Sequence, residues 1–309
     1  MGAERIGNDM TPGRLWYLLQ RDWKRGFPAA WHDRFVSRRI IDWRNPFAGV
    51  AADGVPVHVL TGRDDWLLAC WMLASWFHTT ARNWRIVIHD DGHLPAEAWP
   101  VFEKMFPGVT GVVAADADRK VIEALAGHPA CRDYRQAHPL ARKIFDIPAL
   151  TTADRFIILD SDVLFFRKPE AMLRWCENAT GECWFNEDLQ ESLPIPREEV
   201  RAKLGIDVWP RVNSGLCLMD RSAIDLDLCE RALRETGLLA GHIWLVEQAL
   251  FAICASAHGA GGLLPPEYEV SLAKKARPDA VARHYVGAVR QRFYGEGMAR
   301  AKGELLSHR

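Results

Sequence analysis

Three short apolar runs, each followed by a polar turn, most constrain what this chain can fold into. They cover residues 55–60, 84–89 and 156–159. A short apolar run bounded by turn residues is typical of a strand that is buried on both faces. Helical patterns follow the strands, at residues 66–77, 96–105, 120–126 and 140–150, and a further strand is expected at 109–114. Strands that alternate with helices predict an α/β fold, a Rossmann-like mixed, mostly parallel sheet flanked by helices.

The second half of the chain is less regular. Its apolar patterns predict strands at 183–185 and 216–219 and helices at 221–236 and 244–257. We expect three parts along the whole chain: a helical extension at 1–53, a main domain at 54–295 and a tail at 296–309.

Composition narrows the class of protein. The 309 residues are 49% hydrophobic and 26% charged, which disfavours wholesale disorder and a multi-span membrane protein. A formal net charge of −1 gives no general attraction to nucleic acid, so nucleic acid is not expected as a partner. The seven cysteines form no CxxC pair, which disfavours a disulfide framework and a zinc ribbon. No apolar secretory segment opens the chain, and we expect a cytoplasmic protein.

Residues 1–52 are basic and rich in aromatic residues. The segment contains nine Lys or Arg residues and five acidic residues. Aromatic residues are interleaved with them, namely Trp16, Tyr17, Trp23, Trp31 and Trp43. Such a segment fits a helical extension that packs its aromatic side on the main domain. The alternative is peripheral contact with an anionic membrane at its inner face.

Two carboxylates follow the clearest strand of the chain. Asp160 and Asp162 come directly after the apolar run 156–159, and apolar residues continue after them. Alternation along an extended chain points side chains i and i+2 to the same side, so both carboxylates can face one cation. Hard oxygen ligands at this density suit Mg²⁺ or Mn²⁺. The alternative is a capped turn without a metal.

A second polar cluster, His89-Asp90-Asp91-Gly92-His93, follows the strand at 84–89. Histidines at i and i+4 beside two aspartates fit the metal site of a hydrolase, which is the competing enzyme class. The other interpretation from the residues alone is a polar turn at a strand end.

Four segments resemble the nucleotide-sugar glycosyltransferases with the GT-A fold, especially the family 8-like group of galactosyltransferases and glycogenin. The segment 156–166 is similar to the DxD segment of that group, 212–219 to its Asn-Ser/Ala-Gly strand, and Glu247-Gln248 to its Asp-Gln pair. The fourth, His284-Tyr-Val-Gly287-Ala-Val-Arg290, resembles the closing motif His-x-x-Gly-x-x-Lys, with Arg in place of Lys. The order along the chain is that of the family, over roughly residues 55–295.

The resemblance implies a role for each matching residue. Asp160, Asp162 and His284 would hold Mn²⁺ or Mg²⁺, and Asp160 and Ser161 would lie near the nucleotide. Gly287 would let the backbone approach the diphosphate, and Arg290 would neutralise it. The remaining donor contacts would come from Lys143, or Arg142 in its place, and from Thr61, Gly62 and Asp91 at the edge of the nucleotide pocket. A solvated helix face is the alternative for Lys143.

The resemblance also implies the catalytic end of the site. Gln248 would face the anomeric carbon, Glu247 would contact sugar hydroxyls, and Asn213 would bind the sugar or acceptor unless it is a turn asparagine. We expect transfer from a nucleotide diphosphate sugar, a UDP-sugar by resemblance, with retention of configuration. A non-catalytic nucleotide-sugar or glycan-binding homologue is the alternative outside enzymes. The acceptor stays open among glycans, lipid-linked glycans and proteins.

Tryptophans are abundant, at 13 in the chain. Trp66, Trp71 and Trp76 recur along one apolar helix and are expected in the core. Trp184 and Trp209 bracket the region where an acceptor site is expected, and we interpret them as candidate platforms for stacking sugars.

Overall fold

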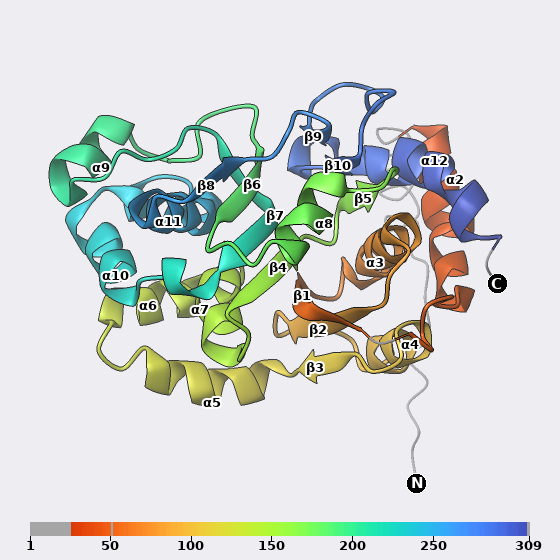
Figure 1. The fold of residues 1–309 in the computed structure, drawn as a ribbon, viewed down its shortest axis with the longest axis horizontal. Helices are drawn as coiled ribbons and strands as arrows, with labels where there is room; N and C mark the ends of the chain where they lie inside the picture. Colours follow the sequence, from red (N-terminus) through yellow and green to blue (C-terminus); the bar gives the residue numbers. More distant parts are fainter. Residues whose placement is uncertain (1–25, 51, 308–309) are drawn as a thin grey trace, which may run out of the picture.

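The computed structural model describes residues 26–50 and 52–307, and its ribbon is shown in Figure 1. Its centre is a seven-stranded sheet. In spatial order the strands are β3 (Thr110–Val112), β2 (Trp84–Asp90), β1 (Asp53–Thr61), β4 (Arg155–Leu159), β7 (Val212–Asp220), β6 (Cys183–Glu187) and β8 (Gly261–Leu263). The strands β1 to β4 run parallel, whereas β7 pairs antiparallel with β4 and β6, and β8 is parallel to β6. The predicted mixed, mostly parallel α/β sheet is therefore confirmed.

A second sheet of three strands positions the site. Its order is β5 (Val163–Phe165), β10 (Ala282–His284) and β9 (Tyr268–Val270). Three residues separate the end of β4 from the start of β5, and β10 runs antiparallel to β5 with His284 opposite Val163. This pairing brings the closing motif of the chain to the turn that carries Asp160 and Asp162.

Helices cover both faces of the large sheet. They are α2 (Phe27–Phe35), α3 (Trp66–Thr80), α4 (Ala98–Met105), α5 (Ala114–Ala124), α6 (Pro129–Ala137), α7 (Ala141–Leu150), α8 (Glu170–Glu177), α9 (Arg197–Leu204), α10 (Leu226–Glu235), α11 (Ile243–His258) and α12 (Met298–Leu305). Short 3-10 segments η1 (Ser37–Asp42), η2 (Arg221–Ala223), η3 (Leu238–Ala240) and η4 (Gly287–Val289) and a π-helical turn η5 (Phe293–Gly297) complete the fold.

The helix expected at 120–126 begins earlier and ends earlier than its pattern indicates, as α5. The helix expected at 221–236 is divided into η2 and α10, because the Asp225 carboxylate accepts a hydrogen bond from the amide of Leu228 and so caps a new helix.

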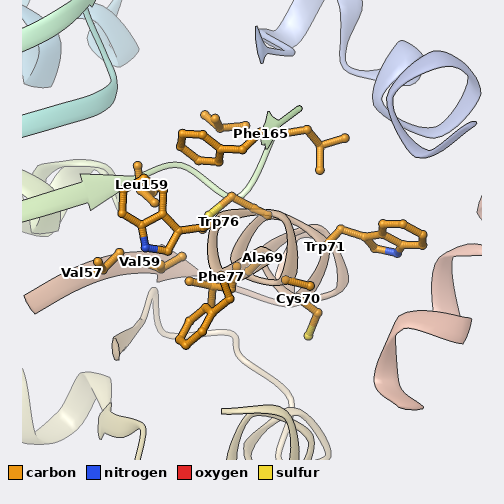
Figure 2. Close-up of a cluster of buried hydrophobic side chains, with 14 of the residues drawn as sticks. Val57, Val59, Ala69, Cys70, Trp71, Trp76, Phe77, Leu159 and Phe165 are labelled. Carbon is orange, nitrogen blue, oxygen red and sulfur yellow. The ribbon is translucent and has the colours of Figure 1, made fainter. Parts of the chain in front are cut away.

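The alternation of side chains along β4 explains the two-sided core. Ile157 and Leu159 pack into the cluster with α3, α4, α8 and α12, while Phe156 and Ile158 pack into the cluster with α6, α7, α10 and α11. Figure 2 shows α3 against the sheet, with the indole of Trp76 next to Val57, Val59 and Leu159. The tryptophans of α3 are buried, so the core role predicted for Trp66, Trp71 and Trp76 is confirmed.

The two ends of the described chain pack together. Helix α2 lies against η5, and α12 packs on α3 (Figure 1). Met298 and Leu305 of α12 are buried. Trp43 is buried in the same core, as expected of a packed extension, but Phe27, Trp31 and Phe35 are exposed along one side of α2. We call these three residues the aromatic ridge. Trp16, Tyr17 and Trp23 lie outside the described residues.

In the part of the chain that the structure describes, every helix is too short or too polar to cross a membrane.

Candidate active site

Asp160 and Asp162 lie in a tight turn that joins β4 to β5. The amide of Val163 donates to the carbonyl of Asp160 over 3.2 Å, and the amide of Asp160 donates to the carbonyl of Gly215 over 2.8 Å. The two carboxylates therefore lie in a turn, and the extended conformation predicted for this segment is wrong. The turn itself brings the two carboxylates to one side, at the carboxyl end of the central strand.

His284 completes a cluster with these carboxylates. Its Nε2 lies 3.1 Å from Asp162 Oδ1 and 3.9 Å from Asp160 Oδ2. Burial alone would raise the pKa of the Asp162 carboxyl, but the imidazole of His284 and the guanidinium of Arg290 hold that pKa below its usual value. Among the described residues, this is the one group of three or more His, Cys, Asp or Glu side chains with ligand atoms close enough to hold a metal, within 4.8 Å of one another.

Asn213 fixes the orientation of the imidazole. Its Oδ1 accepts from the amide of Gly215 and lies 2.8 Å from His284 Nδ1, so Nδ1 carries a proton and Nε2 faces the carboxylates. Asn213 lies on β7 and not in a turn, so the turn interpretation is wrong. Gly215 is required behind the ring, because a Cβ there would stand 2.2 Å from the imidazole. Two carboxylates and an oriented imidazole suit a divalent metal.

Lys143 is fully buried beneath the cluster. Its ammonium lies 2.8 Å from Asp160 Oδ1 and 3.1 Å from Glu247 Oε1 and donates to the carbonyl of Ser214 over 2.9 Å. Burial opposes its charge, but the two carboxylates raise the pKa of the amine above its usual value. The solvated-face interpretation of Lys143 is therefore wrong.

Arg142 does not substitute for Lys143. Its guanidinium lies 3.1 Å from Asp118 and 3.3 Å from Asp146, which are its ion-pair partners in place of Asp160. The alternative donor role suggested for Arg142 is wrong, because adjacent helical residues project in different directions.

Glu247 and Gln248 enter the site from α11 and meet at Ser214. Glu247 Oε2 accepts from the Ser214 hydroxyl over 2.9 Å, and Gln248 Oε1 accepts from the Ser214 amide over 3.3 Å. Asp188 joins this network at the end of β6, accepting from Asn213 Nδ2 over 2.7 Å and from Gln248 Nε2 over 3.3 Å. Asp188 was not among the predicted site residues, because its only local signal is an acidic residue directly after a strand.

Arg290 stands on the other side of Asp162. Its Nη2 lies 2.8 Å from Asp65 Oδ1 and its Nε 3.6 Å from Asp162 Oδ2. Asp65 occupies the N-cap position of α3, yet its side chain makes no cap hydrogen bond and pairs with Arg290 instead. Gly287 opens η4 and has free space around its Cα, while Ser161 is buried in the turn.

A cavity of about 540 Å³ collects most of these residues. The predicted site residues in its lining are Lys143, Asp160, Asp162, Asn213, Glu247, Gln248, His284 and Gly287. A second cavity, of about 570 Å³ and beside α7 and α10, contains none of the predicted site residues. The cavity of about 540 Å³ is therefore the candidate active site.

Thr61, Gly62 and Asp91 meet at the ends of β1 and β2. The amide of Asp91 donates to the carbonyl of Thr61 over 3.1 Å, and a Cβ on Gly62 would stand 2.1 Å from the Asp91 carboxylate. These three residues are absent from the lining of the 540 Å³ cavity, as are Ser161 and Arg290.

The cluster at 89–93 does not assemble a metal site. His89 turns into the core, where its Nε2 lies 2.9 Å from Nδ1 of His58, while His93 is exposed. Asp90 accepts hydrogen bonds from the amides of Gly92 and Leu94, as in a polar turn. The hydrolase hypothesis is wrong because β2 ends at Asp90 and the chain then turns, which leaves His89 in the core and His93 at the surface.

The two tryptophans proposed as sugar platforms lie elsewhere. Trp184 lines a separate cavity of about 240 Å³, and Trp209 packs on the core beside α11. Trp244, in the first turn of α11, lines the 540 Å³ cavity instead.

Comparison with known proteins gives the fold. No protein-family model and no curated protein sequence matches the chain. Among solved structures, the bifunctional glycosyltransferase WbbM superposes with a TM-score of 0.53 at 12% identity, over 84% of this chain and 52% of that one. Galactosyltransferase LgtC (TM-score 0.48, 14% identity, 75% and 87% coverage) and mouse xyloside xylosyltransferase 1 (0.45, 12%, 76% and 98%) also match. The chain has the GT-A fold that its motifs predicted.

Proposed function

We propose that this GT-A-fold chain is a metal-dependent glycosyltransferase that uses a nucleotide diphosphate sugar. The observation that carries the proposal is the meeting of Asp160, Asp162 and His284 in one cavity. The residues fit a divalent ion because two carboxylates face an imidazole whose other nitrogen is held by Asn213. We propose Mn²⁺ or Mg²⁺ as the ion and a UDP-sugar as the donor, following the family motifs.

When bound, the ion would stabilise the negative charge of the departing diphosphate. The protein supplies further positive charge around it. The ammonium of Lys143 balances the negative charges of Asp160 and Glu247, and the guanidinium of Arg290 lies next to Asp162. We propose that Arg290 moves from its pair with Asp65 to a phosphate, because a guanidinium binds phosphate oxygens in the same forked way as it binds a carboxylate.

The sugar end of the donor would lie against α11. We propose that Gln248 faces the anomeric carbon and that Glu247 and Asn213 line the sugar, because all three border the same cavity. The nucleotide end would extend over Ser161 and Gly287 toward Thr61, Gly62 and Asp91.

The anomeric configuration would be retained if the acceptor hydroxyl attacks the anomeric carbon on the same face from which the diphosphate departs. The acceptor hydroxyl oxygen bonds to the anomeric carbon as the carbon–oxygen bond to the diphosphate breaks. That bond's electron pair goes to the diphosphate, and the hydroxyl proton passes to a diphosphate oxygen. The side chains of Glu247 and Gln248 support the oxocarbenium character of the sugar through their dipoles and charge.

The test is nucleoside diphosphate release from a panel of UDP- and GDP-sugars with Mn²⁺. The variant Asp162→Asn should lose at least about 100-fold in release, because a neutral amide oxygen replaces a charged metal ligand. Asp162→Asn should also weaken Mn²⁺ binding measured by electron paramagnetic resonance. Asp116→Asn, an exposed carboxylate of α5, is the matched control and should behave as the wild type.

Two results would contradict the proposal. Release that is unaffected by Asp162→Asn would exclude the metal role of the cluster. Binding of donors without any release would instead indicate the non-catalytic homologue.

We also propose that the protein contacts an anionic membrane from the cytoplasmic side. The aromatic ridge is exposed on α2, and the exposed arginines Arg34, Arg38 and Arg39 lie on or next to that helix. Aromatic rings beside basic residues favour the interface of an anionic bilayer. The seven buried cysteines are all free, which supports a reducing compartment.

A further inference from the structure

Three exposed apolar side chains converge on the mouth of the 540 Å³ cavity. Leu189 follows β6, Trp244 lies in the first turn of α11, and Leu272 lies between β9 and β10. Their exposed fractions are 47%, 54% and 55%. Large apolar residues gathered from three separate segments around one cavity mark a ligand or partner surface.

The cavity changes character from its floor to its mouth. Lys143 and Glu247 at the floor are almost completely buried, and Asp162 is largely buried. The mouth carries the three exposed apolar side chains, and Leu245 and Val286 add partly buried apolar surface to the lining. The charged side chains Lys143, Asp162 and Glu247 are therefore buried in the cavity. The exposed part of the lining offers apolar surface for contact with a ligand.

Trp244 is held as a platform at this mouth. Its indole stacks on the imidazole of His242, with ring centroids 4.5 Å apart and an angle of 20° between the planes. One face of the indole is covered by this stacking, which limits the rotation of the side chain. Leu189 and Leu272 offer no hydrogen bonds, so they suit hydrocarbon better than the hydroxyl-rich surface of a sugar chain.

We infer that the acceptor is amphipathic: a sugar or other hydroxyl-bearing head joined to an apolar substituent, which lies against Leu189, Trp244 and Leu272. The head would reach the buried floor, where the hydroxyl meets the anomeric carbon. This inference rests on the proposed function and specifies its acceptor class. The side chains of Leu189 and Leu272 offer no hydrogen-bond partner to the hydroxyl groups of a hydrophilic glycan, so they favour an apolar substituent.

The experiment compares pairs of glycosides that differ only in the substituent. Methyl and octyl glucosides and galactosides, below the micellar concentration of the octyl compounds, are titrated into the protein calorimetrically in the presence of Mn²⁺. Each octyl chain adds apolar area that the mouth can cover, so at least one octyl glycoside should bind at least about tenfold more tightly than its methyl partner. Octyl glycosides should also lower the acceptor KM in the nucleotide-release assay.

Substitutions at the mouth locate the effect. Trp244→Ala and Leu272→Ala should each reduce the preference for the octyl compound by about threefold or more, because each removes part of the apolar contact area. The matched controls are Ile122→Ala and Leu239→Ala, whose side chains are exposed to 42% and 46% and lie outside the cavity. These controls should bind both compounds as the wild type does.

The inference is overturned if octyl and methyl glycosides bind equally, if neither binds, or if Leu239→Ala weakens octyl binding as much as Trp244→Ala. Failure of the proposed function has a different signature. In that case the wild type shows no metal-dependent release of nucleoside diphosphate from any donor, whatever the glycosides do.

Discussion

The buried ion triad of Asp160, Lys143 and Glu247 allows a sharp test of the site. Replacing Lys143 by Met removes the ammonium and keeps a side chain of similar length. Asp160 is a quarter exposed and can be hydrated, whereas Glu247 is 2% exposed and keeps only the Ser214 hydroxyl. Removing one partner of a buried ion pair costs about 3–5 kcal/mol, because the remaining charge is left uncompensated. We expect Lys143→Met to lower the free energy of unfolding by that amount.

The matched control is the neighbouring cation, Arg142. Its partner Asp146 keeps a bond from Arg135 Nε over 2.6 Å, and its other partner, Asp118, is exposed. Arg142→Met should therefore cost about 1 kcal/mol. A second variant, Lys143→Met/Glu247→Gln, removes the stranded charge and should recover about 1–3 kcal/mol of the loss.

The assay is urea unfolding followed by circular dichroism at pH 7.5, with nucleotide release measured on the same samples. The reasoning is refuted if Lys143→Met and Arg142→Met lose equal stability, or if the double variant is no more stable than Lys143→Met alone. Recovery of stability without recovery of release is the expected pattern, because Glu247 is proposed to contact the sugar.

Three further predictions concern other parts of the molecule. Burial, with a smaller effect of Arg142, lowers the pKa of His89 to about 3; below its ordinary pKa of about 6.5 the unfolded chain binds a proton that the folded chain excludes, so stability falls as the pH falls. This loss amounts to about 2 kcal/mol at pH 5 for His89, and urea unfolding at pH 7.5 and 5 should show a loss smaller by that amount in His89→Phe; an unchanged loss would contradict the assignment. Gly215→Ala should displace the His284 ring and weaken Mn²⁺ binding at least about tenfold, whereas Gly303→Ala, with open space at its Cα, should not; equal Mn²⁺ affinity in both would show that the ring tolerates the methyl group. Replacing the aromatic ridge by serines should reduce co-sedimentation with phosphatidylcholine vesicles that contain phosphatidylglycerol, whereas Leu239→Ser should not, and equal sedimentation of all variants would exclude the ridge as a membrane contact.

Hydrophobic patterns predicted many of the strands and helices, because the formation of each element depends mainly on residues that are close in the sequence. The apolar runs that became β1, β2 and β4 could be read from the sequence, and so could the helices between them. The carboxylates Asp160 and Asp162 and the motif that contains His284 were also found, since each motif is short and continuous. Short elements such as β5, β9 and α6 were not predicted, because they contain too few residues to show a hydrophobic periodicity.

The directions in which individual side chains point could not be predicted from the sequence. A strand-end histidine can point to either face, and the packing of β1 beside β2 turned His89 to His58 rather than to Asp91. Lys143 and Arg142 are neighbours with similar charge, yet the position of α7 against β7 and α11 buried one beneath Asp160 and left the other with Asp118.

The sequence by itself determined β4 and the position of Asp160 and Asp162 directly after it, because periodicity acts over a few neighbouring residues. Only the tertiary structure decided what surrounds them. His284 arrives through the pairing of β10 with β5, and Trp244, not Trp184 or Trp209, reaches the cavity through the placement of α11. The physical reason is that these contacts join residues far apart in the chain, whose meeting depends on how whole elements pack.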